Sequence, residues 1–174
     1  LEGVMEGLAD RVKSTDHFEF YWFPHTGRAA TKSNTRLPGT EALRPLTPVS
    51  RWIDESLLSN SVFRATCAAG TAVPALVPAV NKVAARLLGG RSYTDESHRV
   101  FTHRRTVRFR EMEYGIPAEH LPGAFTALRQ LVEDRGWRIS FPVEVRWAAA
   151  DDRWLSTAYG RDSAYIAVHR YYRE

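Results

Sequence analysis

The chain has a single cysteine, Cys67, among its 174 residues, so no internal disulfide can form. It has no apolar run close to the roughly 20 residues that a membrane-spanning helix needs. Its N-terminus has no basic segment followed by an apolar core, so no secretion signal is evident. Repeats, a glycine-rich phosphate loop and metal-ligand spacing are also absent. These absences predict a cytoplasmic protein without a metal site. They leave open that the intact protein is held peripherally at a membrane.

The chain is basic, with a net charge of +4 and a sequence pI near 9.5. A basic chain raises the question of a nucleic-acid partner. However, the densest cluster, 103–105 with Arg108 and Arg110, alternates with Val107 and Phe109, which is typical of the solvent-facing side of a strand. No recognised nucleic-acid module accompanies the charge, so we expect no nucleic-acid partner. A basic, non-enzymatic α+β binding module stays open as an alternative, and salt-dependent binding to DNA or RNA would support it.

Length and composition indicate one globular domain, with 44% hydrophobic and 25% charged residues. Helices of uneven size separate the predicted strands, and the strands include two hairpins. The sequence therefore predicts an α+β fold, an antiparallel or mixed β-sheet covered by helices. The predicted elements are a helix over 1–13, strands over 17–23 and 28–36, a loop over 37–48, a helix interrupted at Gly70, a helix over 78–88, a short strand over 100–104, a strand over 106–114, a helix over 122–136, and a final hairpin of strands over 141–147 and 163–169 with its turn at 151–152.

The final hairpin carries the most informative charged pair. Since side chains alternate along a strand, Val143 and Val145 share one face while Glu144 and Arg146 share the other. If the hairpin closes, His169 returns towards that pair. Most acid–base pairs on a strand face are solvated and contribute little, so the pattern alone leaves a surface pair and a catalytic pair both open.

Three stretches, 18–25, 109–117 and 141–154, resemble a known enzyme family. They are similar to the C-terminal, substrate-side (cap) domain of the FAD-linked sugar-1,4-lactone oxidases and dehydrogenases. These are the gulonolactone, galactonolactone and arabinonolactone enzymes, with alditol oxidases as relatives, and all are flavoproteins of the vanillyl-alcohol-oxidase type. The resemblance covers essentially the whole chain and is most specific at 144–146 and 149–156. It implies that residues 1–174 form one substrate-side domain of the D-arabinono-1,4-lactone oxidase type.

The resemblance also implies roles for particular residues. The family's Glu-x-Arg pair corresponds to Glu144 and Arg146, which implies catalytic and substrate-binding roles for both and contact with the cofactor for Arg146. A third substrate-binding position corresponds to His169. The implied cofactor is FAD, bound mostly by a separate N-terminal domain that would be the partner of this one. The Arg- and Ala-rich composition favours the bacterial gulonolactone dehydrogenase branch.

Two features of the family are missing from this sequence. One is the flavin domain, including the histidine that bonds to FAD in many members. The other is a C-terminal His-Trp-x-Lys stretch. Because the chain also begins at Leu1, we expect a piece of a longer polypeptide that is inactive alone. The implied reaction is oxidation of a lactone of the L-gulono-1,4-lactone type by hydride transfer to flavin, and the alternative is oxidation of an open-chain alditol such as xylitol or sorbitol.

An isolated substrate-side domain would leave its flavin-facing surface uncovered, so we predict self-association through that surface. Light scattering should give a mass that rises with concentration above the 19.8 kDa of one chain. A constant mass of one chain across the concentration range would contradict this prediction.

Overall fold

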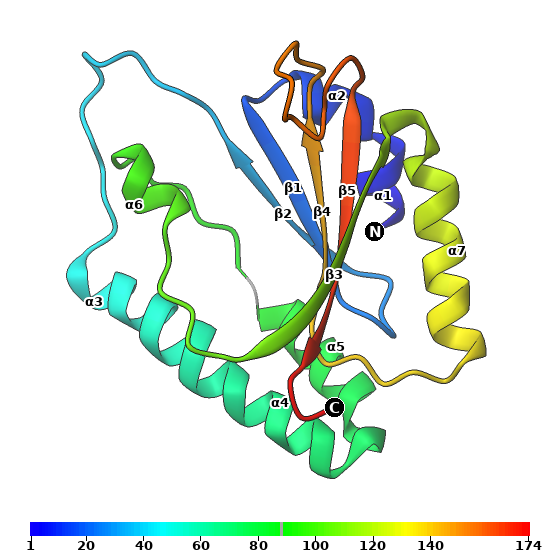
Figure 1. Cartoon of the computed structure of the whole chain (residues 1–174). Coiled ribbons are helices and arrows are strands. Elements are labelled where there is room, and N and C mark those ends of the chain that lie inside the picture. Colours follow the sequence, from blue (N-terminus) through cyan, green and yellow to red (C-terminus); the bar gives the residue numbers. More distant parts are fainter. Residues whose placement is uncertain (88) are drawn as a thin grey trace.

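The computed structural model describes residues 1–87 and 89–174, and its centre is a five-stranded sheet in the order β2-β1-β4-β5-β3 (Figure 1). Each neighbouring pair of these strands is antiparallel. This confirms the α+β prediction and selects the antiparallel sheet from the two types left open. The strands are β1 (His17–Trp22), β2 (Ala29–Asn34), β3 (Phe109–Pro117), β4 (Val143–Ala148) and β5 (Ser163–Tyr171).

Three helices cover one face of the sheet and form the main core with it (Figure 1). Alternate side chains of β1 turn to this face because the strand has a period of two. The rings of Phe20 and Trp22 each meet Phe125 edge to face, with centroids 5.5 Å apart. The helix predicted over 1–13 is broken at Gly7 into two short helices. The covering helices are α1 (Glu2–Glu6), α2 (Leu8–Lys13) and α7 (Leu121–Asp134).

A helical arm flanks the sheet on its other side (Figure 1). Thr47 caps its start by accepting a hydrogen bond from the Ser50 amide at 3.2 Å, as Ser and Thr do at helix N-termini. A second, smaller cluster that includes Cys67 and Phe141 packs the arm against the end of β5. None of the described helices has the length and apolar character needed to cross a membrane. The arm consists of α3 (Pro48–Trp52), the π-helix η1 (Ile53–Val62), α4 (Phe63–Ala72), the 3₁₀ turn η2 (Pro74–Leu76) and α5 (Val77–Leu87).

Several sequence-based boundaries were wrong. The strand predicted over 100–104 is not formed, because Ser97–Phe101 makes the short helix α6 instead and these residues have no strand beside them to pair with. The strand predicted over 106–114 begins at Phe109 and runs to Pro117, where the 3₁₀ turn η3 (Ala118–His120) leads into α7. The predicted helix end at Leu88 lies outside the described residues.

The final strand pair is joined by a long connection over 149–162 and not by a tight turn at 151–152. Asp151 nevertheless makes the local hydrogen bonds that the sequence indicated. It accepts from the Arg153 amide at 3.0 Å and from the Ser156 hydroxyl at 2.6 Å. These bonds give the connection a defined shape although it has no regular secondary structure.

Gly70 does not interrupt the arm as predicted, because it lies inside α4. It is buried where α5 crosses α4, and a Cβ built there would lie 2.9 Å from Cγ2 of Val77. The glycine is therefore required for the close approach of the two helices and not for ending one.

We predict that Gly70→Ala destabilises the protein by about 1–3 kcal/mol, since an added methyl group overpacks a tight contact. Urea unfolding would measure the change, and Val77→Ala in the same chain should recover part of it. Gly123→Ala is the matched control because nothing lies within 4 Å of its Cβ position, and it should leave stability unchanged or raised by up to about 1 kcal/mol. Equal stability of the two alanine variants would refute the packing role of Gly70.

Candidate active site

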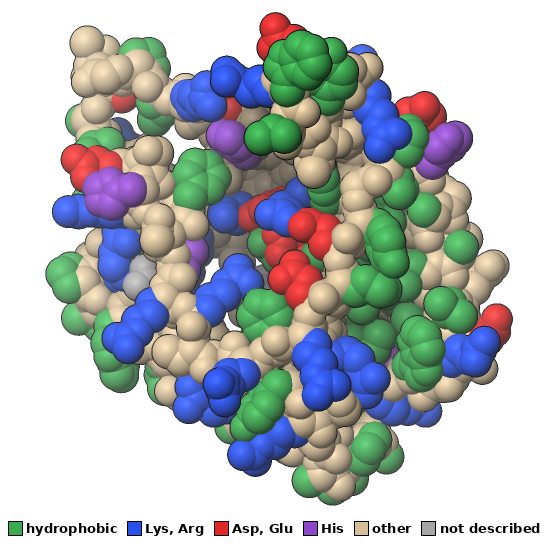
Figure 2. Space-filling model, in the orientation of Figure 1, with side chains coloured by type: hydrophobic (Ala, Val, Ile, Leu, Met, Phe, Trp, Pro, Cys, Tyr) green, Lys and Arg blue, Asp and Glu red, His purple; other side chains and the backbone are tan. Residues whose placement is uncertain are grey.

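The face of the sheet opposite α1, α2 and α7 carries a group of charged side chains, and we call it the polar face. Figure 2 shows that the molecule is hollowed on this side, with acidic and basic side chains gathered on the floor of the hollow. Alternation along each strand and the strand register bring the group together. Its members are Glu19 and Tyr21 of β1, Lys32 of β2, Glu111 and Glu113 of β3, Glu144 and Arg146 of β4, and Tyr165 and His169 of β5.

Arg146 lies at the centre of the polar face. Its Nε is 3.4 Å from Oε1 of Glu144, and its terminal nitrogen donates a hydrogen bond to Glu113. The contact runs diagonally across β5, because the β5 residue opposite Arg146 is Tyr165, whereas Glu113 lies opposite the small Ala167. Partial burial opposes the charge of Arg146, but the bond to Glu113 and the carboxylates of Glu144, Glu113 and Glu19 outweigh it and raise its pKa. The guanidinium is thus a permanent, oriented cation.

Glu144 lies deeper in the polar face than Arg146, with side chains 12% and 44% exposed respectively. Burial is the largest cause that raises the pKa of Glu144 above its ordinary value, and the carboxylate of Glu19 adds to it. The positive charges of Arg146 and Arg105 and the nearby His169 act in the opposite direction. Glu144 is therefore a partly desolvated carboxyl group with a raised proton affinity, beside a fixed cation.

His169 lies on the polar face, as the sequence predicted, but it does not contact Arg146. The β5 residue opposite Glu144 is Ala167, and His169 lies two positions further along the strand. Its Nε2 is 3.3 Å from Oε1 of Glu111. Phe109 and Phe141 enclose its ring, with centroids 5.1 and 6.0 Å away, and only 6% of the residue is exposed. The structure therefore joins Glu144 and Arg146 directly and places His169 further along the same face.

Glu19 pairs directly with Arg146 across β1 and β4. Its Oε1 accepts a hydrogen bond from the Tyr21 hydroxyl at 3.1 Å and lies 2.9 Å from Nζ of Lys32. Burial is the main cause that raises the pKa of Tyr21, and the carboxylates of Glu19 and Glu144 raise it further. Tyr21 therefore remains a hydrogen-bond donor at ordinary pH.

The prediction that the basic cluster lies along a strand was wrong for Arg105. Arg105 was expected on the solvent-facing side of a strand, but it lies in the segment between α6 and β3. Its positive charge acts on Glu144 and on Tyr21, so this segment faces the polar face. Part of the chain's basic charge therefore acts locally on the half-buried carboxylate of Glu144.

Glu19, Tyr21, Lys32 and Glu113 were not predicted as site residues. For Glu19 and Tyr21 a signal was present, because they alternate with three buried aromatic residues in β1. No comparable signal exists for Glu113, which meets Arg146 only because β3 returns to pair with β5.

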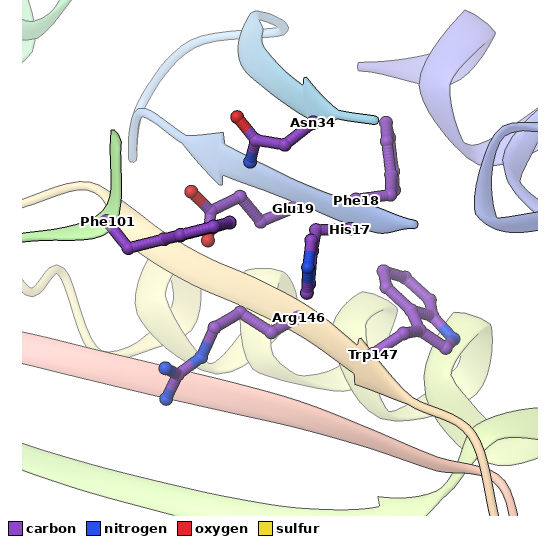
Figure 3. Close-up of a pocket in the computed structure, with 7 residues that line it drawn as sticks. All are labelled: His17, Phe18, Glu19, Asn34, Phe101, Arg146 and Trp147. Carbon is purple, nitrogen blue, oxygen red and sulfur yellow. The ribbon is translucent and has the colours of Figure 1, made fainter. Parts of the chain in front are cut away.

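A cavity of about 210 Å³ opens beside Glu19 and Arg146, with Phe101 of α6 at its side (Figure 3). It is smaller than the roughly 300–1,000 Å³ of pockets for drug-sized ligands, so it suits a small ligand or one part of a larger ligand. Within the described residues, no three His, Cys, Asp or Glu side chains are grouped so as to hold a metal ion. The chemistry available on this face is hydrogen bonding and charge stabilisation.

Comparisons with known proteins identify the family of the chain. The family model described as D-arabinono-1,4-lactone oxidase matches residues 1–174. The chain belongs to the D-arabinono-1,4-lactone oxidase family. This confirms the resemblance stated from the sequence.

Curated relatives from bacteria and animals also match this member of the family. An L-gulono-1,4-lactone dehydrogenase of Mycobacterium tuberculosis is 38% identical over 171 residues, which is 98% of this chain and 39% of the relative. L-Gulonolactone oxidases of Scyliorhinus torazame and Bos taurus are 29% and 26% identical, over 98% of this chain and 38% of each relative. The chain thus spans about two-fifths of the length of these relatives.

The pKa of Glu144 gives a prediction about stability. Because its folded-state pKa lies above the unfolded value of about 4.3, folding is favoured by the protonated form. That contribution is complete below the unfolded pKa and is lost as pH rises through the folded pKa. We therefore expect the free energy of unfolding of wild type to fall, relative to Glu144→Gln, as pH rises through this window.

Urea unfolding at a series of pH values would measure the difference. Glu119→Gln, at an exposed site, is the control and should give a difference that barely changes with pH. A wild type that gains stability relative to Glu144→Gln over the same window would show that attraction to Arg146 outweighs burial.

Proposed function

We propose that this chain is the substrate-side domain of an FAD-dependent enzyme that oxidises a sugar-1,4-lactone of the L-gulono-1,4-lactone type. The observation that carries the proposal is the guanidinium of Arg146 held between Glu144 and Glu113 on an open polar face. Family membership and the printed names of the relatives support the substrate class. The rest of the enzyme, and hence the complete activity, lies in the part of the relatives that this chain does not span.

The fit of this chain to FAD is partial. No glycine-rich phosphate loop occurs in the sequence, and the cavity beside Arg146 is too small for a dinucleotide. The hollow of the polar face, with an exposed guanidinium, suits contact with a flavin ring held by another domain. When bound, the flavin supplies the acceptor for a hydride from the substrate. The self-association expected from the sequence belongs to the same proposal, since the hollow would be the surface that the flavin domain covers.

In this proposal Arg146 binds the hydroxyl group that is oxidised. Its charge is fixed and its forked donors are directional, so it stabilises the negative charge that develops on oxygen as the proton leaves. Glu113 holds one side of the guanidinium, which fixes its orientation. Such positioning contributes to rate because the reacting groups are already aligned.

Glu144 is the proposed proton acceptor and hydrogen-bond partner of the substrate. Its raised proton affinity brings a carboxyl group closer to the pH at which an enzyme works. His169, oriented by Glu111, is the proposed partner of a further substrate hydroxyl. Arg146, Glu144 and His169 could also bind an open-chain alditol. Titrating the intact enzyme with a lactone and with xylitol or sorbitol shows which of the two substrate classes it oxidises.

Arg146→Ala in the intact enzyme should slow flavin reduction by about 100- to 1,000-fold, the usual cost of removing a group that stabilises developing charge. Arg146→Lys should also be slow, because one ammonium cannot replace the fork that contacts two carboxylates. Anaerobic stopped-flow absorbance with L-gulono-1,4-lactone measures the rate. Circular dichroism should show an unchanged fold.

Arg110→Ala is the control, since Arg110 is an exposed arginine of strand β3 that lies outside the polar face. It should reduce flavin at the wild-type rate. The assignment of Arg146 fails if its alanine variant stays within about threefold of wild type, a difference too small for loss of charge stabilisation.

A further inference from the structure

The cavity beside Arg146 exists because two central strands separate. β1 and β4 are paired from Trp22 and Val143 as far as Glu19 and Arg146, and beyond that point they diverge. β1 continues alongside β2 to the pair of His17 and Asn34, while β4 continues alongside β5. The opening between them is the cavity of about 210 Å³, and we call it the splay cavity.

Polar side chains with unused hydrogen-bonding capacity line the splay cavity. Oε1 of Glu19 is engaged by Tyr21 and Lys32, but within residues 1–87 and 89–174 its Oε2 has no hydrogen-bond donor. The side chains of Asn34 and His17 likewise have no hydrogen-bond partner in that part of the chain. An acceptor, an amide and an imidazole thus converge on one small space. Figure 3 shows Glu19, Asn34 and Arg146 extending to the same side, where the ring of Phe101 lies.

Aromatic rings complete the lining of the splay cavity. Phe101 of α6 packs edge to face on His17 at 4.9 Å between centroids, and Trp147 lies at the other end of the cavity. Rings pack well against C–H groups, whereas carboxylate and amide groups bind hydroxyls. A short chain of hydroxylated carbons presents both kinds of group, so the lining suits a polyol segment better than an anion or an apolar chain.

We propose that the splay cavity is a subsite for the exocyclic hydroxyl arm of the lactone, with Glu19 as its main hydrogen-bond acceptor. This inference rests on the proposed function. Glu19 is the direct cross-strand neighbour of Arg146, so a lactone whose reacting hydroxyl meets Arg146 has its arm within reach of the cavity. The volume of the cavity, about 210 Å³, accommodates an arm of two hydroxylated carbons.

The subsite selects lactones by the length of that arm. A hexono-1,4-lactone carries two hydroxylated carbons outside the ring, and a pentono-1,4-lactone of the same ring configuration carries one. The longer arm reaches Oε2 of Glu19 and the Asn34 amide, whereas the shorter arm leaves these groups without a partner. Since an unpaired polar group in a partly buried site is costly, the enzyme prefers the longer arm.

The test compares two lactones in the intact, FAD-loaded enzyme. Anaerobic flavin reduction by L-gulono-1,4-lactone and by the pentono-1,4-lactone of the same ring configuration gives a limiting rate and an apparent Kd for each. In Glu19→Gln the preference for the longer lactone should fall about tenfold, mainly through Kd, because a hydrogen bond to a charged acceptor is weakened. Asn34→Ala should reduce the same preference and serves as a second variant, since its residue lies on the outer strand β2. Glu119→Gln, exposed and outside the cavity, should leave it unchanged.

The possible results distinguish a failure of the subsite proposal from a failure of the proposed function. Equal losses on both lactones in Glu19→Gln would overturn the subsite and show that Glu19 acts through Arg146. An unchanged preference in both Glu19→Gln and Asn34→Ala would overturn it as well. Absence of flavin reduction by either lactone in wild type would overturn the proposed function, and the subsite with it.

Discussion

The cation of Arg146 is the feature on which the polar face depends. Three carboxylates, those of Glu19, Glu113 and Glu144, lie around it on the strands β1, β3 and β4. Carboxylates this close would repel one another if they were left alone, and burial would add to the cost. One guanidinium presents several donors in a rigid plane and so contacts more than one of them in a fixed orientation, whereas a lysine ammonium is a point charge on a flexible stem. The same cation is exposed enough to meet a ligand.

One face of the sheet packs the core, and the opposite face carries the candidate site. The face under α1, α2 and α7 is filled by aromatic and branched side chains, and Val143, Val145 and Phe20 are fully buried there. This packing fixes the register of β1, β4 and β5, because a slip by one residue would turn the apolar set outward. The same register sets which charged residues lie side by side on the opposite face. The core therefore positions the site.

The α+β class, the first hairpin, the helix α7 and the pairing of Glu144 with Arg146 could all be predicted from the sequence, because each depends on neighbours in the chain. The segment around Val100 and Arg105 could not. Its apolar and basic residues alternate as in a strand, but no strand lies beside it, so it forms α6 and a charged connection. Gly70 shows the same limit, since whether a glycine ends a helix or admits a neighbour depends on where α5 crosses.

The sequence by itself determined which residues alternate, which strand bears the Glu-x-Arg pair, and which family the chain resembles. These are properties of periodicity and local composition, and they need no knowledge of what lies across the sheet. Only the tertiary structure decided that Glu113 and Glu19 complete the surroundings of Arg146, that His169 pairs with Glu111, and that β1 and β4 diverge to leave a cavity. Strand order and register decide those contacts, because they join residues far apart in the chain through packing that no single segment encodes.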